Sequence, residues 1–240
     1  MAKMQIERVD LGTQGFEVSK LGFGCMNLTG PYTAALKQLP REKIQIATKF
    51  GIAIRSVMQI KGSPEYVLLC CEASLKRLDV EYIDLYYQHR VDQTLGIGIV
   101  PYSPFGRSFF GGRGVVENVP ATSSLKAHAR FQAENLDKNK NIYERIESLA
   151  KKHQATPAQL ALAWVLQQGE DVVPIPGTTK IKNLDQNIGG LAVKVSEKNR
   201  REICEAVPIG DVAGARCPDG MERFTWKNAN TPPKDSRIST

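Results

Sequence analysis

The stretch YIDLYYQHRVDQTLGIGIVPYSPFGR, Tyr82–Arg107, decides the fold. It holds two runs that are typical of β-strands, YIDLYY and GIGIVPYS. The first leads to His89 and the second to a Ser-Pro-Phe-Gly-Arg turn. Few polar residues, RVDQT, separate them, whereas parallel neighbouring strands need a crossover of about a dozen residues or more. Any assignment of the fold must explain why this link is so short.

Outward from this stretch, predicted strands alternate with predicted helices. The residues QIERVDLGTQGFEVSKLGFG predict a hairpin that leads into the first of the strands. The strands are expected at Leu21–Cys25, Ile44–Lys49, Tyr82–Gln88, Gly96–Ser103 and Val172–Pro176. Helices are expected in SPEYVLLCCEASLKRL, NKNIYERIESLAKKH, TPAQLALAWVLQQG, NLDQNIGGL and SEKNRREICEAV. The polar, Gly-rich segment Phe109–Asn135 is expected to be a functional loop or a mobile flap. This alternation favours a parallel α/β architecture.

Composition narrows the classes of function. The chain has 240 residues, which suits one α/β domain or two small ones, and 42% of them are hydrophobic. The net charge is +7, but the basic residues are scattered, which argues against nucleic acid and suits an anionic small ligand. The sequence holds neither an apolar run of about 18 residues nor an apolar signal segment, so we expect no membrane span and a cytoplasmic location. Five irregularly spaced cysteines predict reduced thiols and no metal site.

Two candidate catalytic residues end predicted strands. Lys49 closes the run KIQIATKF, and His89 follows the strand Tyr82–Gln88. In parallel α/β folds, sites collect at the carboxyl ends of the strands. A lysine there can tune a neighbouring acid, and a histidine can donate a hydrogen bond to a carbonyl oxygen. The alternative is a rim lysine and a hydrogen-bonded histidine without catalytic roles.

Two strand ends carry residues suited to an anion. In YSPFGR a hydroxyl, a glycine and a guanidinium follow a strand, and in IPGTTKIKNLDQN a glycine, two threonines and Lys180 precede a helix. Both patterns offer hydrogen-bond donors and positive charge to a phosphate. Neither is a P-loop, and the chain has no Rossmann glycine motif. Two such ends together favour a nucleotide ligand.

The sequence resembles the aldo-keto reductases, within them the plant branch that includes perakine reductase and auxin-induced-protein-like reductases. The resemblance rests on KLGFGCM, IATKFG, CCEASLKRLDVEYIDLYYQHRVD, GIGIVPYSPFGR, TPAQLALAWVL and VVPIPGTTKIKNLDQNIGGL. It implies a (β/α)8 TIM barrel, NADP(H) as cofactor, and hydride transfer between the nicotinamide and an aldehyde or ketone. The expected partner is a small carbonyl or alcohol substrate, with neither nucleic acid nor membrane.

The resemblance also assigns roles to residues. It implies that Lys49 and His89 are the lysine and histidine of the family's Asp-Tyr-Lys-His tetrad, with His89 also touching the substrate. It implies a set of cofactor-binding residues at three strand ends: Gly24, Cys25, Met26, Ser103, Pro104, Phe105, Gly106, Arg107, Gly177, Thr178, Thr179, Lys180, Gln186 and Asn187. Within this set, Lys180 would approach the 2′-phosphate, and Gln186 and Asn187 would approach the adenine.

The departures from the family explain the short link. The family carries two more strands with their helices between YYQHRVD and LGIGI, and a D-T-x-x-x-Y-G-like motif near GPYTAALKQLP, all of which this chain lacks. The sequence therefore predicts one domain over residues 1–240, internally truncated near 32–33 and 94–95, with about five of the eight barrel strands. The tetrad Asp and Tyr are absent, which leaves Tyr32 as a candidate surrogate acid in the substrate pocket.

Three functional hypotheses remain open at this point. The first is an NADP(H)-dependent aldo-keto reductase that is weak or inactive in this form. The second is a non-catalytic nucleotide-binding or partner-binding relic. The third is a chain that does not fold stably, because lost strands leave open sheet edges.

Overall fold

The computed structural model describes residues 5–13, 15–25, 31–54, 58–60, 63–88 and 98–217. The chain divides into two compact units. Unit 1 comprises residues 1–24 and 96–240, and unit 2 comprises residues 25–95. The predicted link 90–95 falls outside the described residues, as do His89 and Met26.

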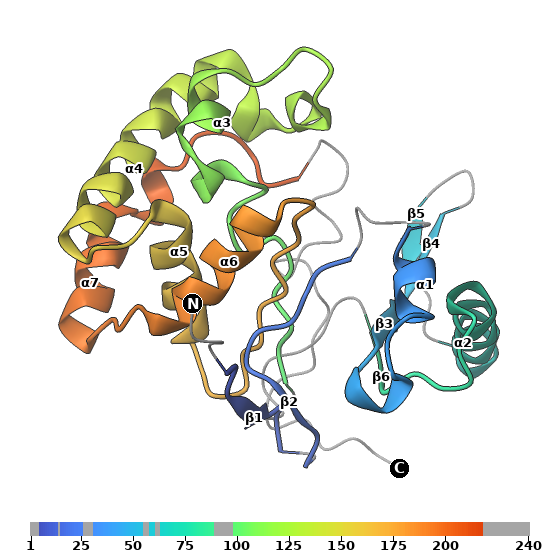
Figure 1. Ribbon diagram of the computed structural model, residues 1–240. Helices are drawn as coiled ribbons and strands as arrows, with labels where there is room; N and C mark the ends of the chain where they lie inside the picture. Colours follow the sequence, from blue (N-terminus) through green and yellow to red (C-terminus); the bar gives the residue numbers. More distant parts are fainter. Residues whose placement is uncertain are drawn as a thin grey trace, which may run out of the picture. The chain divides into compact units, whose positions relative to one another are not determined.

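Three extended segments run side by side in unit 1, at residues 21–24, 98–103 and 172–177 (Figure 1). The middle segment is 172–177, which hydrogen-bonds to both of the others. From one hydrogen bond to the next, the residue numbers increase on both segments of each pair, so the three segments are parallel. The bonds run from Ile99 N–H to Asp171 O (2.8 Å), Val173 N–H to Ile99 O (2.8 Å), Ile175 N–H to Pro101 O (3.1 Å), Gly22 N–H to Pro174 O (3.0 Å) and Gly24 N–H to Pro176 O (3.3 Å).

Prolines explain why these predicted strands do not form complete ladders. Pro174 and Pro176 accept from Gly22 and Gly24 but have no N–H to return the bond. The ladder to residues 21–24 is therefore half made, and pairing with 98–103 is confined to two isolated parallel bridges, Ile99 to Val172 and Tyr102 to Ile175. The sequence predicts strands at Leu21–Cys25, Gly96–Ser103 and Val172–Pro176. The described parts of these ranges are extended and parallel to one another, but they are not regular strands.

Two glycines let the backbones approach at the carboxyl ends of these segments. A Cβ added to Gly177 would lie 2.5 Å from Gly24 O, and one added to Gly24 would lie 2.6 Å from Ile175 O. Cβ atoms do not tolerate such distances from a carbonyl oxygen, so glycine is required on both sides of the contact.

Four regular helices lie on one side of the three segments (Figure 1). They are α4 (Ala133–Lys152), α5 (Pro157–Leu166), α6 (Ile181–Gly189) and α7 (Glu197–Ala206). Capping boxes begin two of them, with Thr156 and Gln159 at α5 and with Ser196 and Asn199 at α7. The four predicted helices of this region are confirmed, although α4 begins six residues before the predicted Asn139.

The segment predicted as a loop, Phe109–Asn135, is part of the core instead. It forms η4 (Phe109–Gly111), α3 (Arg113–Glu117), η5 (Ser124–Ala127) and η6 (Ala129–Phe131) before α4 begins. Its buried side chains pack with α4 in one apolar cluster: Phe109, Val116, Val119, Phe131, Leu136, Ile142 and Tyr143. The apolar residues of this segment have irregular spacing, so the sequence shows neither the 3.6-residue period of a helix nor the two-residue period of a strand.

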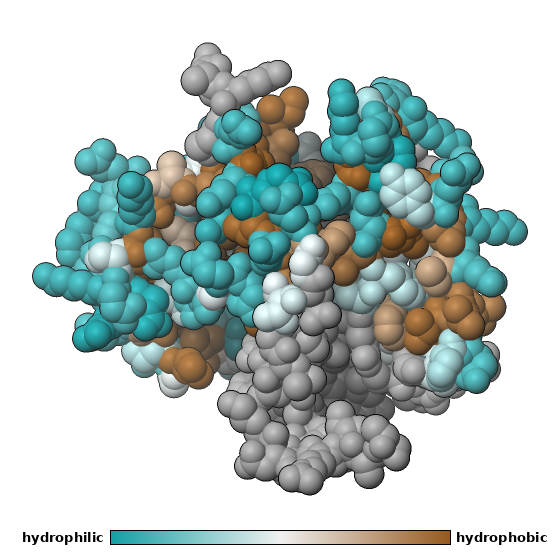
Figure 2. Space-filling view, turned by 90° about the horizontal axis from the view of Figure 1, so that it is seen from below, coloured by the Kyte–Doolittle hydropathy of each residue, from teal (hydrophilic) through white to brown (hydrophobic). Residues whose placement is uncertain are grey.

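The N-terminal hairpin is confirmed, with β1 (Arg8–Asp10) antiparallel to β2 (Glu17–Ser19). A second apolar cluster joins α4, α5 and α7 through Ile146, Ala150, Leu160, Ala163, Val195 and Ile203. The chain then passes through η8 (Ile209–Asp211). Hydrophilic side chains cover much of the face in Figure 2, with apolar patches among them. Among the described helices, none is both long and apolar enough to cross a membrane.

Unit 2 is built around one parallel pair of strands, β3 (Ala47–Phe50) and β6 (Leu85–Gln88). The helix α2 (Pro64–Leu78) connects them, and Ser63 caps it by accepting from Tyr66 N–H, as the sequence predicts. The unit also contains α1 (Pro31–Leu36), η2 (Arg41–Lys43) and an unpredicted antiparallel hairpin of β4 (Ile52–Ile54) and β5 (Met58–Ile60).

The close approach at Gly177 generates a stability prediction. Gly177→Ala forces its Cβ against Gly24 O, so we expect the free energy of unfolding to fall by roughly 1–3 kcal/mol. Gly210→Ala is the matched control, because nothing lies within 4 Å of its added Cβ. Thermal and urea unfolding of both variants measure the difference, and equal stability of the two would contradict the prediction.

Candidate functional site

The carboxyl ends of the three parallel segments meet at one edge of unit 1, which we call the anion edge. It comprises Gly24, the turn 103–111 and residues 177–180. Because 98–103 and 172–177 are parallel neighbours, the turn and the start of α6 emerge at the same end. The structure thus brings together the two sequence-predicted anion-binding motifs and Gly24, which the family resemblance assigned to the cofactor.

The turn 103–111 has an unusual backbone. The φ angles of Ser103, Gly106, Arg107 and Ser108 are 51°, 59°, 59° and 70°, so three residues with side chains occupy the left-handed region. Such residues cost about 1–2 kcal/mol each, and runs of them arise where a backbone is shaped for a ligand.

This conformation leaves donors unused. Within the turn, Gly106 N–H donates to Ser103 O at 3.0 Å, and Phe110 N–H donates to Phe105 O at 3.2 Å. The N–H groups of Arg107 and Ser108 have no backbone acceptor among the described residues. Two successive N–H groups without a backbone acceptor, beside a guanidinium, offer donors and positive charge to an anionic oxygen.

The second part of the anion edge begins α6. Thr178 Oγ1 accepts from Lys180 N–H at 3.1 Å, which fixes the approach to the helix. Lys180 occupies the N-cap position, but its side chain makes no capping hydrogen bond and is exposed. Gln186 is half-buried on α6, and Asn187 is only 5% exposed, so only its edge can reach a ligand.

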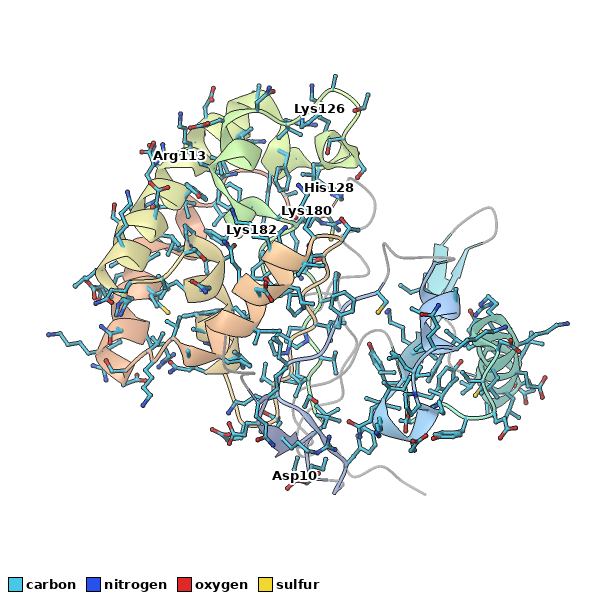
Figure 3. All side chains as sticks on the ribbon, in the orientation of Figure 1. Asp10, Arg113, Lys126, His128, Lys180 and Lys182 are labelled. Carbon is cyan, nitrogen blue, oxygen red and sulfur yellow. The ribbon has the colours of Figure 1, made fainter. Side chains whose placement is uncertain are left out.

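A third basic element lies beside the turn and was missed by sequence reasoning. Phe109 at the end of the turn packs edge-on against Phe131 of η6, with ring centroids 6.3 Å apart. This contact attaches η6 and the preceding His128 to the turn. In Figure 3, His128 and Lys180 lie on the same side of the unit, at the end of α6 that carries Lys180. A lone histidine in an irregular segment gives no periodic or motif signal.

The electrostatics of His128 reflect this position. Its Nδ1 is buried and has no hydrogen-bond partner among the described residues. Burial lowers the pKa of the imidazole below its usual value, and the nearby positive charge of Arg107 lowers it further.

The cations of the anion edge are not neutralised within the described part of unit 1. Most basic side chains elsewhere in the unit have carboxylate partners, such as Arg113 with Glu147 on α4. That partnership raises the pKa of Arg113 through a hydrogen bond and lowers the pKa of Glu147. No ion pair between described residues involves Arg107 or Lys180 of the anion edge, or the nearby Lys126, Arg130 and Lys182. The same holds for five other basic residues of the unit: Lys138, Lys140, Lys194, Lys198 and Arg216. An unpaired basic cluster favours an anionic ligand.

Unit 2 holds the other candidate, Lys49. In the parallel register Lys49 lies opposite Tyr87, and its side chain is on the exposed face of β3. Both strands run to the same end, so β6 stops with Gln88 opposite Phe50, one residue before His89. The backbone of Tyr32 lies in α1, and its side chain is not among those that the structure describes.

The ion pair between Arg41 and Asp84, which we call the carboxylate lock, lies at the start of β3 and β6. Arg41 Nη2 donates to Asp84 Oδ2 at 2.6 Å and to Tyr82 O at 2.9 Å, and its guanidinium stacks 3.7 Å from the centre of the Tyr82 ring. Asp84 also accepts from Ile46 N–H at 2.8 Å. The carboxylate thereby joins the residues before β3 to those before β6.

The described residues contain no cluster of three or more metal-ligating side chains. None of the five cysteines forms a disulfide, and burial raises the pKa of the Cys25 thiol.

The comparisons with known proteins agree on one family. The model of the "Aldo/keto reductase family" matches residues 27–95 and 93–207. "Probable aldo-keto reductase 1" of Glycine max is 57% identical over 346 positions, an alignment that covers all of both chains. A crystal structure of a thermostable aldo-keto reductase, Tm1743, in complex with the inhibitor epalrestat superposes with a TM-score of 0.60 at 17% identity. It covers 84% of this chain and 100% of that one.

The carboxylate lock in unit 2 generates the second prediction. Asp84→Asn removes the charge from a side chain that is 19% exposed, and we expect a loss of roughly 1–3 kcal/mol in unfolding free energy. Asp79→Asn is the control, because the Asp79 side chain is 65% exposed in its pair with Lys37 and should contribute less than about 1 kcal/mol. Chemical denaturation of both variants tests the difference, and an equal loss in the control would count against the lock.

Proposed function

The chain belongs to the aldo/keto reductase family, and on that premise we propose that it binds NADP(H) and retains weak or no reductase activity toward aldehydes and ketones. Its fold is the α/β fold of that family in partial form, a (β/α)8 barrel represented by about five strand positions. We further propose that both units derive from one domain, and that the free cysteines suit a cytoplasmic location.

The observation that carries the cofactor proposal is the anion edge. Two N–H groups without a described backbone acceptor, together with Arg107 and Lys180, follow the ends of neighbouring parallel segments, and no ion pair between described residues involves either cation. A dinucleotide's phosphates fit this chemistry, because they need backbone donors and unpaired cations together. The close backbone contact of Gly24 with Gly177 keeps side chains out of the same edge.

When bound, NADPH supplies a hydride to a carbonyl carbon, and the protein's own residues must hold the cofactor and the carbonyl and supply a proton. We assign the pyrophosphate to the turn 103–107 and the adenosine end to residues 177–187. Lys49 and His89 are the proposed tetrad members that polarise the carbonyl oxygen, by positive charge and by a donated hydrogen bond. The chain lacks the tetrad tyrosine, which would act as the acid that protonates the developing alkoxide.

Two findings support the proposed truncation. The alignment with the soybean relative runs over 346 positions, whereas this chain has 240 residues, so the relative has residues where this chain has none. The family model matches in two stretches that meet at residues 93–95, within the short link of the opening sequence. The sequence has no D-T-x-x-x-Y motif to provide the tetrad Asp and Tyr.

The alternative function is a nucleotide-binding or partner-binding relic without turnover. The same absent motif favours it, because a general acid often contributes 10²–10⁴-fold to a rate, by order of magnitude. Cofactor binding is common to both functions, and the two differ in whether hydride leaves the nicotinamide.

The third prediction concerns cofactor choice. Lys180→Ala should raise the Kd of NADPH by roughly tenfold or more, because a charge-assisted contact to the 2′-phosphate is lost. The Kd of NADH should change by less than about twofold, because NADH has no 2′-phosphate. Lys198→Ala on α7 is the control, and fluorescence titration of both cofactors gives the values. An equal loss for NADPH and NADH would remove Lys180 from this role.

The fourth prediction concerns turnover. Without the tetrad tyrosine we expect NADPH oxidation with an activated aldehyde on the order of 10²–10⁴-fold below that of an intact family member. Tyr32→Phe should leave this residual rate unchanged. Turnover comparable with an intact reductase that disappears in Tyr32→Phe would identify Tyr32 as the acid and overturn the expectation of weak activity.

A further inference from the structure

We propose that His128 forms an additional wall of the anion edge beside Arg107, and that the His128 imidazole takes up a proton when a nucleotide phosphate binds there. This inference rests on the proposed function for its ligand, a 2′-phosphorylated adenine nucleotide. It adds a pH-dependent contribution to affinity from a segment outside the sequence blocks on which the family resemblance rests.

The placement of His128 follows from packing. The turn that carries Arg107 ends in Phe109, which is buried and packs against Phe131 and Tyr143. His128 precedes η6, and Phe131 N–H donates to its carbonyl oxygen at 2.9 Å. The aromatic contact therefore holds His128 beside the turn, and Nδ1 of the imidazole has no hydrogen-bond partner among the described residues.

Basic side chains lie near the imidazole. Arg107 acts on it electrostatically, Lys126 and Arg130 flank it in the sequence, and Lys180 lies at the near end of α6 (Figure 3). None of these four forms an ion pair with a described carboxylate. Arg130 instead donates to Gly214 O, and burial lowers the pKa of its guanidinium, with nearby Arg216 lowering it further.

These surroundings make the free protein hold His128 neutral. Burial disfavours the imidazolium, and Arg107 disfavours it further, so the pKa of His128 lies below its usual value. A bound phosphate places negative charge beside the imidazole and raises its pKa. Since the bound state then holds more protons than the free state, affinity must increase as the pH falls through the pKa of the complex.

The surroundings of His128 support a ligand role over a packing role. Nδ1 of His128 and Nε2 of His153 are both buried without a partner among the described residues, so this feature alone does not separate the two histidines. His128 differs because Arg107, whose N–H has no backbone acceptor among the described residues, acts on its imidazole.

The test uses 2′,5′-ADP, which carries a 5′-phosphate for the turn that holds Arg107 and a 2′-phosphate for Lys180, without a nicotinamide. Binding is measured by isothermal titration calorimetry of the full chain at pH 6 and pH 8. Proton uptake is measured from the dependence of the binding enthalpy on the buffer's ionisation enthalpy. The variant is His128→Gln, and the matched control is His153→Gln. The control histidine follows α4, whose 20 residues span about 30 Å, and its Nε2 is likewise unpartnered.

We expect the wild-type chain and the control to gain roughly tenfold more affinity than His128→Gln on going from pH 8 to pH 6, with proton uptake lost in that variant. The phosphate's own titration cancels, because all three proteins bind the same ligand. The same gain and proton uptake in His128→Gln would overturn the inference, as would failure of the folded wild-type chain to bind 2′,5′-ADP at either pH.

NADPH and NADH titrations separate this inference from the proposed function. Binding of 2′,5′-ADP with the His128-dependent response, but no binding of NADPH, upholds the phosphate contact while the proposed dinucleotide function fails. Binding of NADPH with no effect of His128→Gln on its pH dependence leaves the proposed function standing and overturns the inference.

Discussion

The backbone hydrogen bonds of residues 172–177 to both neighbouring segments are the constraint on which the described part of unit 1 depends. Val173 and Ile175 donate to one side, and the carbonyl oxygens of Pro174 and Pro176 accept from the other. This pairing aligns three chain ends at one edge, and the helices α4 to α7 lie against one side of it (Figure 1). Every residue that we assign to the phosphates reaches its place through these bonds.

The anion edge combines two features that are unfavourable without a ligand. The turn keeps Ser103, Arg107 and Ser108 in the left-handed region, and the surrounding cations repel one another without carboxylates to offset them. The apolar cluster around Phe109, together with the capped helices behind it, supplies the stability that such a site needs. A phosphate would relieve the repulsion and use the free N–H groups, so the site is arranged for an occupied state.

Much of the fold follows from the sequence, and the exceptions have physical causes. The helix α2 was predictable from Ser63 and Pro64, and α5 from Thr156 and Pro157, because caps and 3.6-residue periodicity act locally. The packing of Phe109–Asn135 was not predictable, because its buried side chains meet α4 through tertiary contacts alone. The anion motifs could be predicted from residue types at strand ends. The surroundings of His128 form only when the chain folds, so its role could not be predicted from the sequence. The carboxylate lock between Arg41 and Asp84 joins residues far apart in the sequence, so local sequence patterns could not predict it either.

The alternating prolines of the VVPIPG segment have a consequence for the chain before it is fully folded. An apolar strand with free N–H groups on both sides can recruit a second copy and nucleate intermolecular β-sheet. Pro174 and Pro176 have no N–H on the side that faces residues 21–24, so that side cannot sustain a reciprocal ladder with a foreign strand. The same residues that weaken the native ladder thus act as gatekeepers against aggregation, a protection that matters most in a chain with fewer strands to cover its central one.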